Sequence, residues 1–477
     1  MTTRKARHAL VLGGGLAGTL AAAAVAELAD AVTVLDRDHF PDGPADRKGV
    51  PQSRHTHGLV SGGVRAVDAL LPGTSAALFE AGAQRIGVPD RYLALGPHGW
   101  FPRYPGEQYI LGCSRSLLDW TLRSRLRDKA PSITYVEGAD VLGLLGDAER
   151  VTGARTRHRG TREETDIEAD LVVDATGRGS AVTDWLAALG LPAFDEESVD
   201  AGIFYATRLF RVLDGAGEDF PAINIQADPG AERVRAAGMV IPIEGGRWSI
   251  TLSGATGGHP PIDDAGFQAF AESLPHPVIG ELTARAEPLG PAFGFAAHAN
   301  RKRHFGKAKA WPAGFVVVGD AQTTLNPVYG HGMAVAAKSA VALREGLAAH
   351  GLGGTRAIQR AVGATAADAW AIATGEDLRH RTTVGRRPPG SNAVYKLQDR
   401  LAKAAPSRPA IATAQIAVIT LAAPASVLVK PGVLLDALRG PDRPALTEPP
   451  LTGAERRLID TTAPRAAEAA PAEEEVH

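Results

Sequence analysis

Apolar runs and polar turns alternate along the first forty residues. Residues 9–12 are uniformly apolar and are followed by glycines, which predicts a buried strand that ends in a turn. The alanine-rich stretch 16–28 favours a helix, and the apolar residues 31–35 predict a second strand. Together these segments predict a βαβ unit over residues 8–36.

Three segments before residue 180 carry equally clear patterns. An amphipathic stretch opens on Ser114, a residue type favoured at helix N-caps, and predicts a helix over residues 114–123. Residues 133–136 and 170–173 are mostly apolar or β-branched and predict strands, the second of which ends at a glycine turn.

The pattern changes between residues 198 and 300, where short alternating segments rich in β-branched residues appear. These segments are residues 202–210, 222–226, 239–243 and 248–253. They predict an antiparallel sheet that forms one wall of a substrate cavity. From about residue 333 onward the chain is predicted to be mostly helical.

Composition narrows the class of protein. The 477 residues are enough for two or three domains, and 44% hydrophobic and 22% charged residues are ordinary for a soluble globular protein. A net charge of −2 gives no reason to expect nucleic acid as a partner. The single cysteine, Cys113, excludes an internal disulfide and a cysteine-based zinc site, and it fits a cytoplasmic location.

Two segments near the C-terminus have unusual compositions. Residues 411–429 carry no charge, which raises the question of a membrane span. Because the segment holds Gln415, Pro424 and several hydroxyl residues, we interpret it as a packed helix that ends near Pro424, and we expect no membrane contact. Residues 461–477 are rich in Ala, Pro and Glu and are predicted to be disordered.

The first glycine turn has the spacing Gly13-x-Gly15-x-x-Gly18 between a predicted strand and a predicted helix. In a dinucleotide-binding fingerprint the first glycine permits the tight turn, the second lets the backbone approach a pyrophosphate, and the third lets helix and strand pack closely. Asp36 ends the second strand, where a carboxylate can accept hydrogen bonds from both ribose hydroxyls. These residues predict dinucleotide binding.

A second glycine motif lies far along the chain. It consists of a predicted strand over residues 315–318 followed by Gly319, Asp320, Asn326, Pro327, Gly330, His331 and Gly332. Together with the first motif, it indicates that two distant parts of the chain hold one flavin cofactor.

The combined motifs resemble those of the FAD-dependent aromatic hydroxylase superfamily, which has the para-hydroxybenzoate hydroxylase fold. The resemblance covers about residues 8–375 and also rests on the Arg115-x-x-Leu118 helix and on the turn at residues 174–177. It implies an α/β fold with a Rossmann-like FAD-binding domain, an antiparallel-sheet substrate domain and a helical C-terminal region.

The resemblance also suggests domain boundaries. The expected divisions are an FAD-binding domain of residues 1–197 and 301–375, a substrate-binding sheet domain of residues 198–300, a helical region of residues 376–460 and a disordered tail of residues 461–477.

A narrower resemblance, almost end to end, is to the flavin epoxidases of polyether polyketide biosynthesis of the monensin and lasalocid type. The segments that carry it are residues 47–57, 114–119, 174–180, 205–210, 242–248 and 326–333. It implies epoxidation of alkenes in a polyene polyketide or similar intermediate by a flavin C4a-hydroperoxide. The implied partners are a hydrophobic substrate, O2 and NAD(P)H, the last used directly or through a separate flavin reductase.

The resemblance implies roles for individual residues. Asp320 would accept hydrogen bonds from the ribityl hydroxyls, and Arg115 would contact the flavin or its phosphates, unless it forms an ion pair with Asp119. The full set of expected cofactor-binding residues is Gly13, Gly15, Leu16, Ala17, Gly18, Asp36, Arg37, Arg47, Lys48, Arg115, Asp174, Gly177, Asp320, Pro327, Gly330, Gly332 and Met333.

Two positions depart from the hydroxylase pattern. Met333 stands where many hydroxylases carry Asn, which puts hydrogen bonding on that side of the flavin in doubt. The turn after Gly177 lacks the Asp-Gly pair that helps many hydroxylases to contact NAD(P)H, so the route of reduction stays open.

Because the flavin supplies the chemistry, few side chains are candidates for a catalytic role. His331, between two glycines, either hydrogen-bonds locally or assists proton delivery. His55 and His57 lack a third ligand, so we interpret them as loop hydrogen-bonding residues and expect no metal. Candidates for substrate contact, with ordinary packing as the alternative, are Tyr205, Arg208, Pro242 and Trp248.

Other functions on the same scaffold stay open. They are hydroxylation of an aromatic or indole substrate, reduction of isoprenoid double bonds, and nucleotide binding without catalysis. Halogenation is disfavoured because residues 246–250 do not supply the Trp-x-Trp-x-Ile-Pro segment of flavin halogenases.

Overall fold

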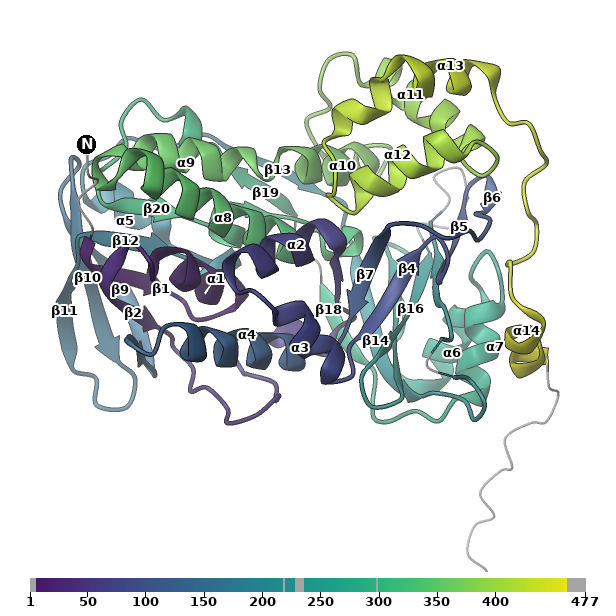
Figure 1. Ribbon diagram of the computed structural model, residues 1–477, viewed down its shortest axis with the longest axis horizontal. Helices are drawn as coiled ribbons and strands as arrows, with labels where there is room; N and C mark the ends of the chain where they lie inside the picture. The colour runs from purple at the N-terminus through teal and green to yellow at the C-terminus, as the bar shows by residue number, and fades with distance from the viewer. Residues whose placement is uncertain (1–5, 218, 228–235, 297–298, 461–477) are drawn as a thin grey trace, which may run out of the picture.

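A five-stranded parallel sheet forms the centre of the larger part of the molecule (Figure 1). The computed structural model describes residues 6–217, 219–227, 236–296 and 299–460. In spatial order the strands are β20 (Phe315–Val317), β12 (Leu171–Asp174), β1 (Ala6–Leu12), β2 (Ala29–Leu35) and β8 (Ile133–Val136). Leu12 pairs with Asp174 on one side and with Leu35 on the other, so three strands end at the same edge.

Helices cover one face of this sheet. They are α1 (Leu16–Val25), α2 (Ser61–Leu70), α3 (Thr74–Glu80), α4 (Arg115–Lys129), α8 (Gly332–His350), α9 (Thr355–Ala364) and α10 (Ala367–Asp377). Ala9 and Val11 of β1 point into this helical layer, where they are fully buried. The predicted βαβ unit, the predicted helix after Ser114 and the strand at 133–136 are confirmed.

The opposite face packs against a small antiparallel meander. The meander consists of β9 (Ala139–Gly146), β10 (Val151–His158) and β11 (Glu164–Glu168), and α5 (Val182–Ala188) lies beside it. Leu10 and Leu12 of β1 point into this second core, because successive side chains of a strand face opposite sides. Burial on both faces explains the uniformly apolar sequence of β1.

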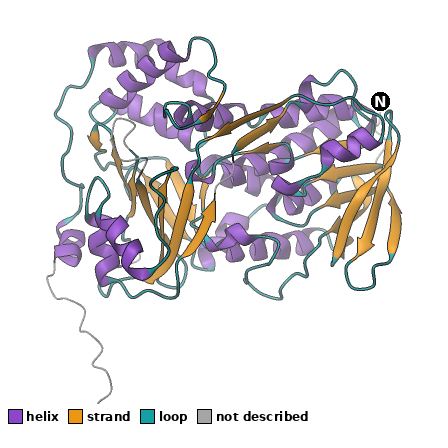
Figure 2. Cartoon of the chain, turned by 180° about the vertical axis from the view of Figure 1, so that it is seen from behind, coloured by secondary structure: helices purple, strands orange, loops and turns teal. Residues whose placement is uncertain are grey.

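A seven-stranded sheet forms the second part of the molecule, and its strands are conspicuous in Figure 2. In spatial order they are β18 (Phe293–Ala296), β14 (Phe204–Arg211), β17 (Arg247–Gly254), β16 (Ala237–Ile243), β15 (Ala222–Ile225), β5 (Tyr92–Gly96) and β6 (Gly99–Trp100). The predicted antiparallel sheet is thus confirmed. Two of its strands, β5 and β6, come from residues before 198. The chain reaches this sheet after α3 and β4, and β5 pairs in parallel with β15.

The two faces of the seven-stranded sheet have different neighbours. Helices α6 (Asp264–Glu272) and α7 (Val278–Arg285) cover one face. The other face contacts a three-stranded sheet of β3 (Gly58–Val60), β7 (Gln108–Gly112) and β4 (Gln84–Val88).

A four-stranded sheet lies beside the loop that leads into α8. Its order is β21 (Thr323–Thr324), β19 (Asn300–Arg303), β13 (Glu196–Asp200) and β22 (Val384–Gly385).

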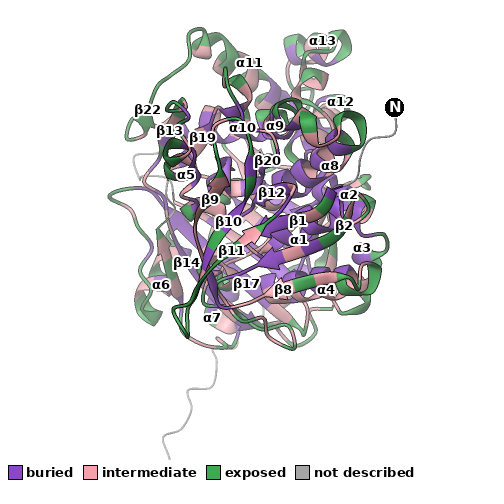
Figure 3. Cartoon of the chain, turned by 90° about the vertical axis from the view of Figure 1, so that its left-hand side faces the viewer, coloured by how far each residue is buried: buried purple, intermediate pink, exposed green. Residues whose placement is uncertain are grey.

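The C-terminal helices form a layer of their own with a small core. They are α11 (Ser391–Ala404), α12 (Pro409–Ile419), the 3-10 turn at Ala425–Val429 and α13 (Pro431–Arg439). In Figure 3 much of α11 and α13 is exposed, whereas β12 and β20 are buried. A long segment, yellow in Figure 1, then runs from α13 to α14 (Gly453–Asp460) beside α7.

The uncharged segment 411–429 is not one helix. Helix α12 ends at Ile419, five residues before Pro424, because Leu421 adopts a left-handed backbone with φ of 52°. Across the described ranges no helix is both long and apolar enough to cross a bilayer. The tail at 461–477, for which disorder was predicted, lies outside the described residues.

Candidate functional site

The first glycine motif shapes the start of α1. Gly13 has φ of +94°, and a Cβ there would lie 2.6 Å from the Ala175 carbonyl oxygen. A Cβ on Gly18 would lie 1.7 Å from the Gly13 oxygen. Gly13 and Gly18 are therefore required by the packing of the protein itself.

Gly15 differs from its two neighbours in the motif. A Cβ on Gly15 would meet no protein atom within 4 Å, so the backbone here faces open space. Gly15 is the N-cap residue of α1, and the N–H groups of Leu16, Ala17 and Gly18 belong to the first turn, which leaves donors without intrahelical partners. Such a helix start attracts an anion.

Asp36 lies at the end of β2, beside the glycine turn. Its Oδ2 accepts a hydrogen bond from Gly14 N at 2.7 Å, and its Oδ1 accepts one from Asp38 N at 2.8 Å. These two bonds fix the carboxylate at the position where the sequence predicted a ribose partner.

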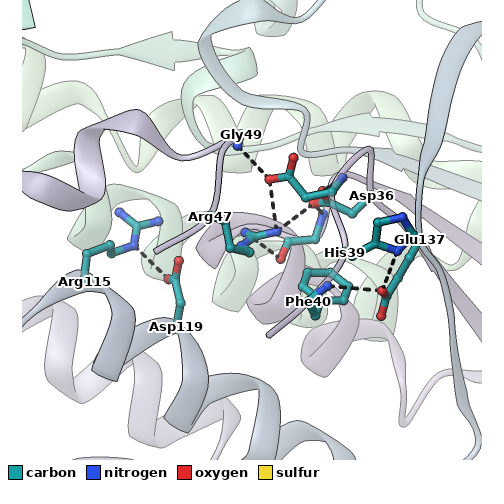
Figure 4. A network of polar contacts seen from close by, with 10 residues as sticks. Asp36, His39, Phe40, Arg47, Gly49, Arg115, Asp119 and Glu137 are labelled. Carbon is teal, nitrogen blue, oxygen red and sulfur yellow. Dashed lines mark hydrogen bonds and ion pairs between the residues drawn. The ribbon is translucent and has the colours of Figure 1, made fainter. Parts of the chain in front are cut away.

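Arg47 brings a buried positive charge to the same place. Its Nη1 lies 3.4 Å from Asp36 Oδ2, and its guanidinium lies over the Phe40 ring at 4.9 Å (Figure 4). Among the described residues Nε and Nη1 have no hydrogen-bond acceptor, although Nη1 also lies 3.9 Å from Asp38 Oδ2. Since buried donors are normally paired, Arg47 retains capacity for an anionic ligand. Arg37 and Lys48 are exposed.

Arg115 and Asp119 form a buried ion pair one helical turn apart, shown to the left in Figure 4. Arg115 Nε donates to Asp119 Oδ1 at 2.8 Å. The alternative expected for Arg115, an ion pair with Asp119, is thus present, and the remaining guanidinium nitrogens stay available to a ligand.

The second glycine motif packs directly on the first. Gly319 has φ of +59°, and a Cβ there would lie 2.9 Å from Ala17 Cβ, so only glycine allows this approach. Asp320 follows, and one carboxylate oxygen lies 3.9 Å from where a Cβ on Gly332 would be. The chain thus brings Asp320 between the starts of α1 and α8.

Burial raises the pKa of Asp320, and the guanidinium groups of Arg178 and then Arg115 act in the opposite direction. A carboxylate near several guanidinium groups suits hydroxyl groups of a ligand, because an ionised carboxylate accepts hydrogen bonds.

The turn before α8 exposes the start of a long helix. It comprises the 3-10 turn Pro327–Tyr329 and Gly330, which has φ of +67°. The N–H groups of Gly332 and Met333 then lie in the first turn of a 19-residue helix, where they can stabilise negative charge on a ligand.

His331 points away from this helix start. Its Nε2 hydrogen-bonds the Ile419 carbonyl oxygen at 2.8 Å, while Nδ1 is buried without a partner. Burial lowers the pKa of His331, so the imidazole is neutral at pH 7. The geometry corresponds to the local hydrogen-bonding alternative rather than to proton delivery.

Asp174 supports the turn after β12 from within. It is fully buried, and it accepts hydrogen bonds from Thr176 N at 2.9 Å and from Ser180 Oγ at 2.6 Å. The carboxylate therefore acts on protein groups, and Gly177, with φ of +79° and open space at its Cβ position, is the part of this turn that could face a ligand.

The loop that follows Arg47 crosses to the seven-stranded sheet. His55 Nδ1 lies 2.8 Å from Thr207 Oγ1, and Thr56 Oγ1 lies 2.7 Å from Thr251 Oγ1. Burial lowers the pKa of His55 to about 4 and that of His57 to about 3. The two histidines are thus neutral loop residues, and no group of three or more metal-ligating side chains occurs within the described ranges.

The four predicted substrate contacts divide between the two faces of the sheet. Tyr205 faces the second glycine motif, where its hydroxyl donates to Asn326 Oδ1. Arg208 faces α6, since its Nε donates to the Gly290 oxygen at 2.7 Å and its Nη1 pairs with Asp264. Pro242 and Trp248, a directly paired couple, lie on that same helix-covered face.

Arg208, Pro242 and Trp248 were expected to contact the substrate, and this expectation is wrong because they lie on the face that the helices cover. The alternation of the strands was predicted, but alternation alone does not identify which face meets helices. The structure turns Thr207 and Thr251 toward the site instead.

Residues that the sequence did not single out complete the site. Arg178 has a buried Nη1 without an acceptor and influences Asp320, while Asn300 and Asp377 contact the turn at Asn326. The glycine motifs mark Asn326, but Asn300 and Asp377 meet it only through the fold, so no local sequence signal could have identified them.

Comparison with solved structures defines the class of fold. The flavin-dependent brominase Bmp2 superposes with a TM-score of 0.63 at 16% identity, over 87% of this chain and 93% of that one. PqsL of Pseudomonas aeruginosa, described as "a probable FAD-dependent monooxygenase", gives a TM-score of 0.57 at 16% identity, over 78% and 97%. The protein thus has the fold of flavin-dependent halogenases and monooxygenases.

A curated relative defines the family. Protein Rv3254 of Mycobacterium tuberculosis is 32% identical over 422 residues, which span 85% of this chain and 87% of the relative. The chain belongs to the family of that protein. No family model matches the sequence.

Proposed function

We propose that the protein is an FAD-dependent monooxygenase that epoxidises alkenes of a hydrophobic secondary-metabolite intermediate, such as a polyene polyketide. The observation that carries the FAD assignment is the open backbone at Gly15 beside the unsatisfied nitrogens of Arg47. A pyrophosphate would satisfy both, because it is an anion that accepts from helix N–H groups and from a guanidinium.

The remaining cofactor contacts follow from the order of groups along the site. Asp320 would accept from the ribityl hydroxyls, and the first turn of α8 would face the flavin ring. Arg115 would add a positive charge near the ribityl chain, since its charge influences Asp320.

Bound flavin, once reduced, supplies the chemistry that activates O2 and transfers one oxygen atom to an alkene. The balance is that alkene, O2, two electrons and two protons give an epoxide and water. The chain's own task is to hold the double bond in place, exclude water and stabilise negative charge with the N–H groups of α8.

The substrate would lie against the cofactor side of the seven-stranded sheet. This face combines hydroxyl side chains, such as Thr207 and Thr251, with an apolar cluster that includes Tyr205 and the partly buried Phe295. A mixed surface of this kind suits a long apolar chain that carries oxygen substituents.

The reductant and location complete the proposal. NAD(P)H would supply the electrons, directly or through a separate flavin reductase. A cytoplasmic location is supported by Cys113, which is a buried free thiol.

Because a flavin-dependent brominase shares this fold, the identity of the product decides which reaction the protein performs. We expect purified protein, supplied with a reductant, O2, bromide and a polyene, to add one oxygen atom per alkene by mass spectrometry. A brominated product, a hydroxylated arene or an alkene reduced without O2 uptake would each replace epoxidation with the corresponding alternative.

Gly15 offers a sharp test of FAD binding. A Cβ at Gly15 would meet no protein atom within 4 Å, so we expect Gly15→Val to fold normally but to exclude the pyrophosphate and lose FAD. Gly143→Val is the matched control, because Gly143 lies in strand β9 with equally open space. Measured flavin retention in Gly15→Val equal to that of the control would reject the assignment.

A further inference from the structure

A buried carboxylate, Asp377, lies at the centre of a hydrogen-bond network beside the proposed flavin. Asp377 is the last residue of α10 and is fully buried. Its Oδ2 accepts from Asn300 Nδ2 at 2.7 Å, and its Oδ1 accepts from Tyr329 Oη at 2.8 Å. Asn326 Nδ2 approaches Oδ2 at 3.5 Å.

The network fixes the orientation of the Asn326 side chain. Asn326 Oδ1 accepts from the hydroxyl of Tyr205 and from Val328 N at 3.2 Å. With its oxygen used by two donors, the amide must turn its Nδ2 toward Asp377, which can only accept.

The backbone of the turn is fixed as well. Asn326 N donates to Asn300 Oδ1 at 2.7 Å, while Asn300 itself donates to Asp377. Asp377 thus holds both ends of the turn, Asn326 through Asn300 and Tyr329 through its hydroxyl. The turn leads into Gly330 and the first turn of α8.

The network also crosses between parts of the molecule. Tyr205 belongs to β14 of the seven-stranded sheet, Asn300 belongs to β19, and Asp377 belongs to α10. Leaving such a carboxylate without its donors would be unfavourable in a buried site. The five side chains of the network, Tyr205, Asn300, Asn326, Tyr329 and Asp377, therefore form one cooperative unit.

We propose that Asp377 is a positioning residue that sets the turn at Asn326 and Tyr329 against both the flavin and the substrate-side residue Tyr205. The inference rests on the proposed function. It assigns to Asp377 control over how the N-terminus of α8 meets the flavin edge, although Asp377 itself touches neither cofactor nor substrate.

The test compares Asp377→Asn with the wild-type holoenzyme. The variant keeps the shape of the side chain but replaces one acceptor oxygen with a donor. Either Tyr329 or Asn300 can then no longer donate to residue 377, which changes the geometry of the network. We expect about a 10-fold weaker FAD affinity, in line with the loss of an outer-shell partner. We also expect a shifted flavin reduction potential and an altered visible spectrum.

Two further variants keep the test decisive if Asp377→Asn folds poorly. Tyr329→Phe and Tyr205→Phe each remove one hydroxyl from the network and leave the carboxylate in place. Glu455→Gln is the control, since Glu455 is also a buried carboxylate but pairs with Arg103 far along the chain. The control should retain the wild-type potential and spectrum.

The results for wild type and variants distinguish a failure of the proposed function from a failure of the role proposed for Asp377. Wild-type protein that binds no FAD would overturn the proposed function and with it the role of Asp377. Wild-type protein that binds FAD, together with network variants whose affinity, potential and spectrum match it, would overturn the role of Asp377 alone.

Discussion

Asp320 is the residue whose removal most directly tests the flavin end of the site. Its carboxylate lies among Arg178, Arg115 and the start of α8. We expect Asp320→Ala to weaken FAD binding by about 2–3 kcal/mol through loss of charge-assisted hydrogen bonds, with little change in thermal stability. Titration with FAD followed by flavin fluorescence measures the effect. Unchanged affinity would remove Asp320 from the site.

The two loop histidines predict a pH dependence of stability. The folded-state pKa is about 4 for His55 and about 3 for His57, whereas the ordinary value is 6.5. Below about pH 6.5 the unfolded chain therefore binds protons that the folded chain does not. Stability should be complete above that pH and fall toward pH 4, by up to about 1.4 kcal/mol per pH unit for each histidine.

Urea unfolding at a series of pH values measures this slope. His55→Gln and His57→Gln should each flatten it, because each variant removes one histidine whose pKa is lowered by burial. Equal slopes in all three proteins would contradict the assignment.

At the residue scale, the sequence predicts the roles of residues that act on their near neighbours in the chain. The spacing of Gly13, Gly15 and Gly18 predicts a strand-turn-helix unit because the glycines act within one turn. The facing of Arg208 depends on which side of β14 meets α6, and the place of Asp377 depends on contacts with residues 48 and more positions away in the chain. Neither leaves a local pattern.

At the element scale, the end of α12 is attached to the helices around the site. Gly62 N donates to the Thr420 oxygen at 3.0 Å, and Lys338 Nζ donates to the Leu421 oxygen at 2.8 Å. With His331 Nε2 on the Ile419 oxygen, the three successive carbonyls of residues 419–421, at and just beyond the end of α12, are bonded to α2, to α8 and to the residue that precedes α8. The sequence predicted a helix here but not its end, because the left-handed Leu421 is stabilised by these distant donors.

Gly62 makes this attachment testable. A Cβ on Gly62 would lie 2.2 Å from the Leu421 oxygen, so Gly62→Ala should displace α12 and destabilise the protein by about 1–3 kcal/mol. Gly432→Ala is the control, since Gly432 is also near a helix start but has open space around it. Thermal melting and limited proteolysis report the difference, and identical results for the two variants would contradict it.

At the scale of the whole molecule, the chain passes several times between the part built on the five-stranded sheet and the part built on the seven-stranded sheet. Strand β5 enters the second sheet from the N-terminal half, and the segment after α13 returns to the same sheet. There Trp100 N donates to the Leu446 oxygen at 2.9 Å. The two-part architecture was predicted from changes in periodicity, whereas these crossings were not, because short segments such as β5 carry too little pattern.

A partly buried ion pair joins α14, at the end of this segment, to the loop that follows β6. Arg103 Nη1 lies 2.7 Å from Glu455 Oε2, which also accepts from Thr452 N at the start of α14. Glu455→Gln should destabilise the protein by about 1–3 kcal/mol without changing flavin affinity. Glu448→Gln, at a side chain 68% exposed, should stay within about 0.5 kcal/mol of the wild type. Chemical denaturation distinguishes the two, and equal stabilities would show that the pair contributes nothing.

The contact between Gly319 and Ala17 has a consequence for the biosynthesis of the protein. These residues belong to the proposed nucleotide site but leave the ribosome about three hundred residues apart, and the entropy of closing so long a loop must be overcome before they meet. The start of α1 must therefore wait for β20 to join the edge of the sheet before a flavin can be gripped at both ends. With the proposed function, cofactor capture would follow translation of both motifs, and refolding with FAD present should raise the yield of native chain only in its final phase.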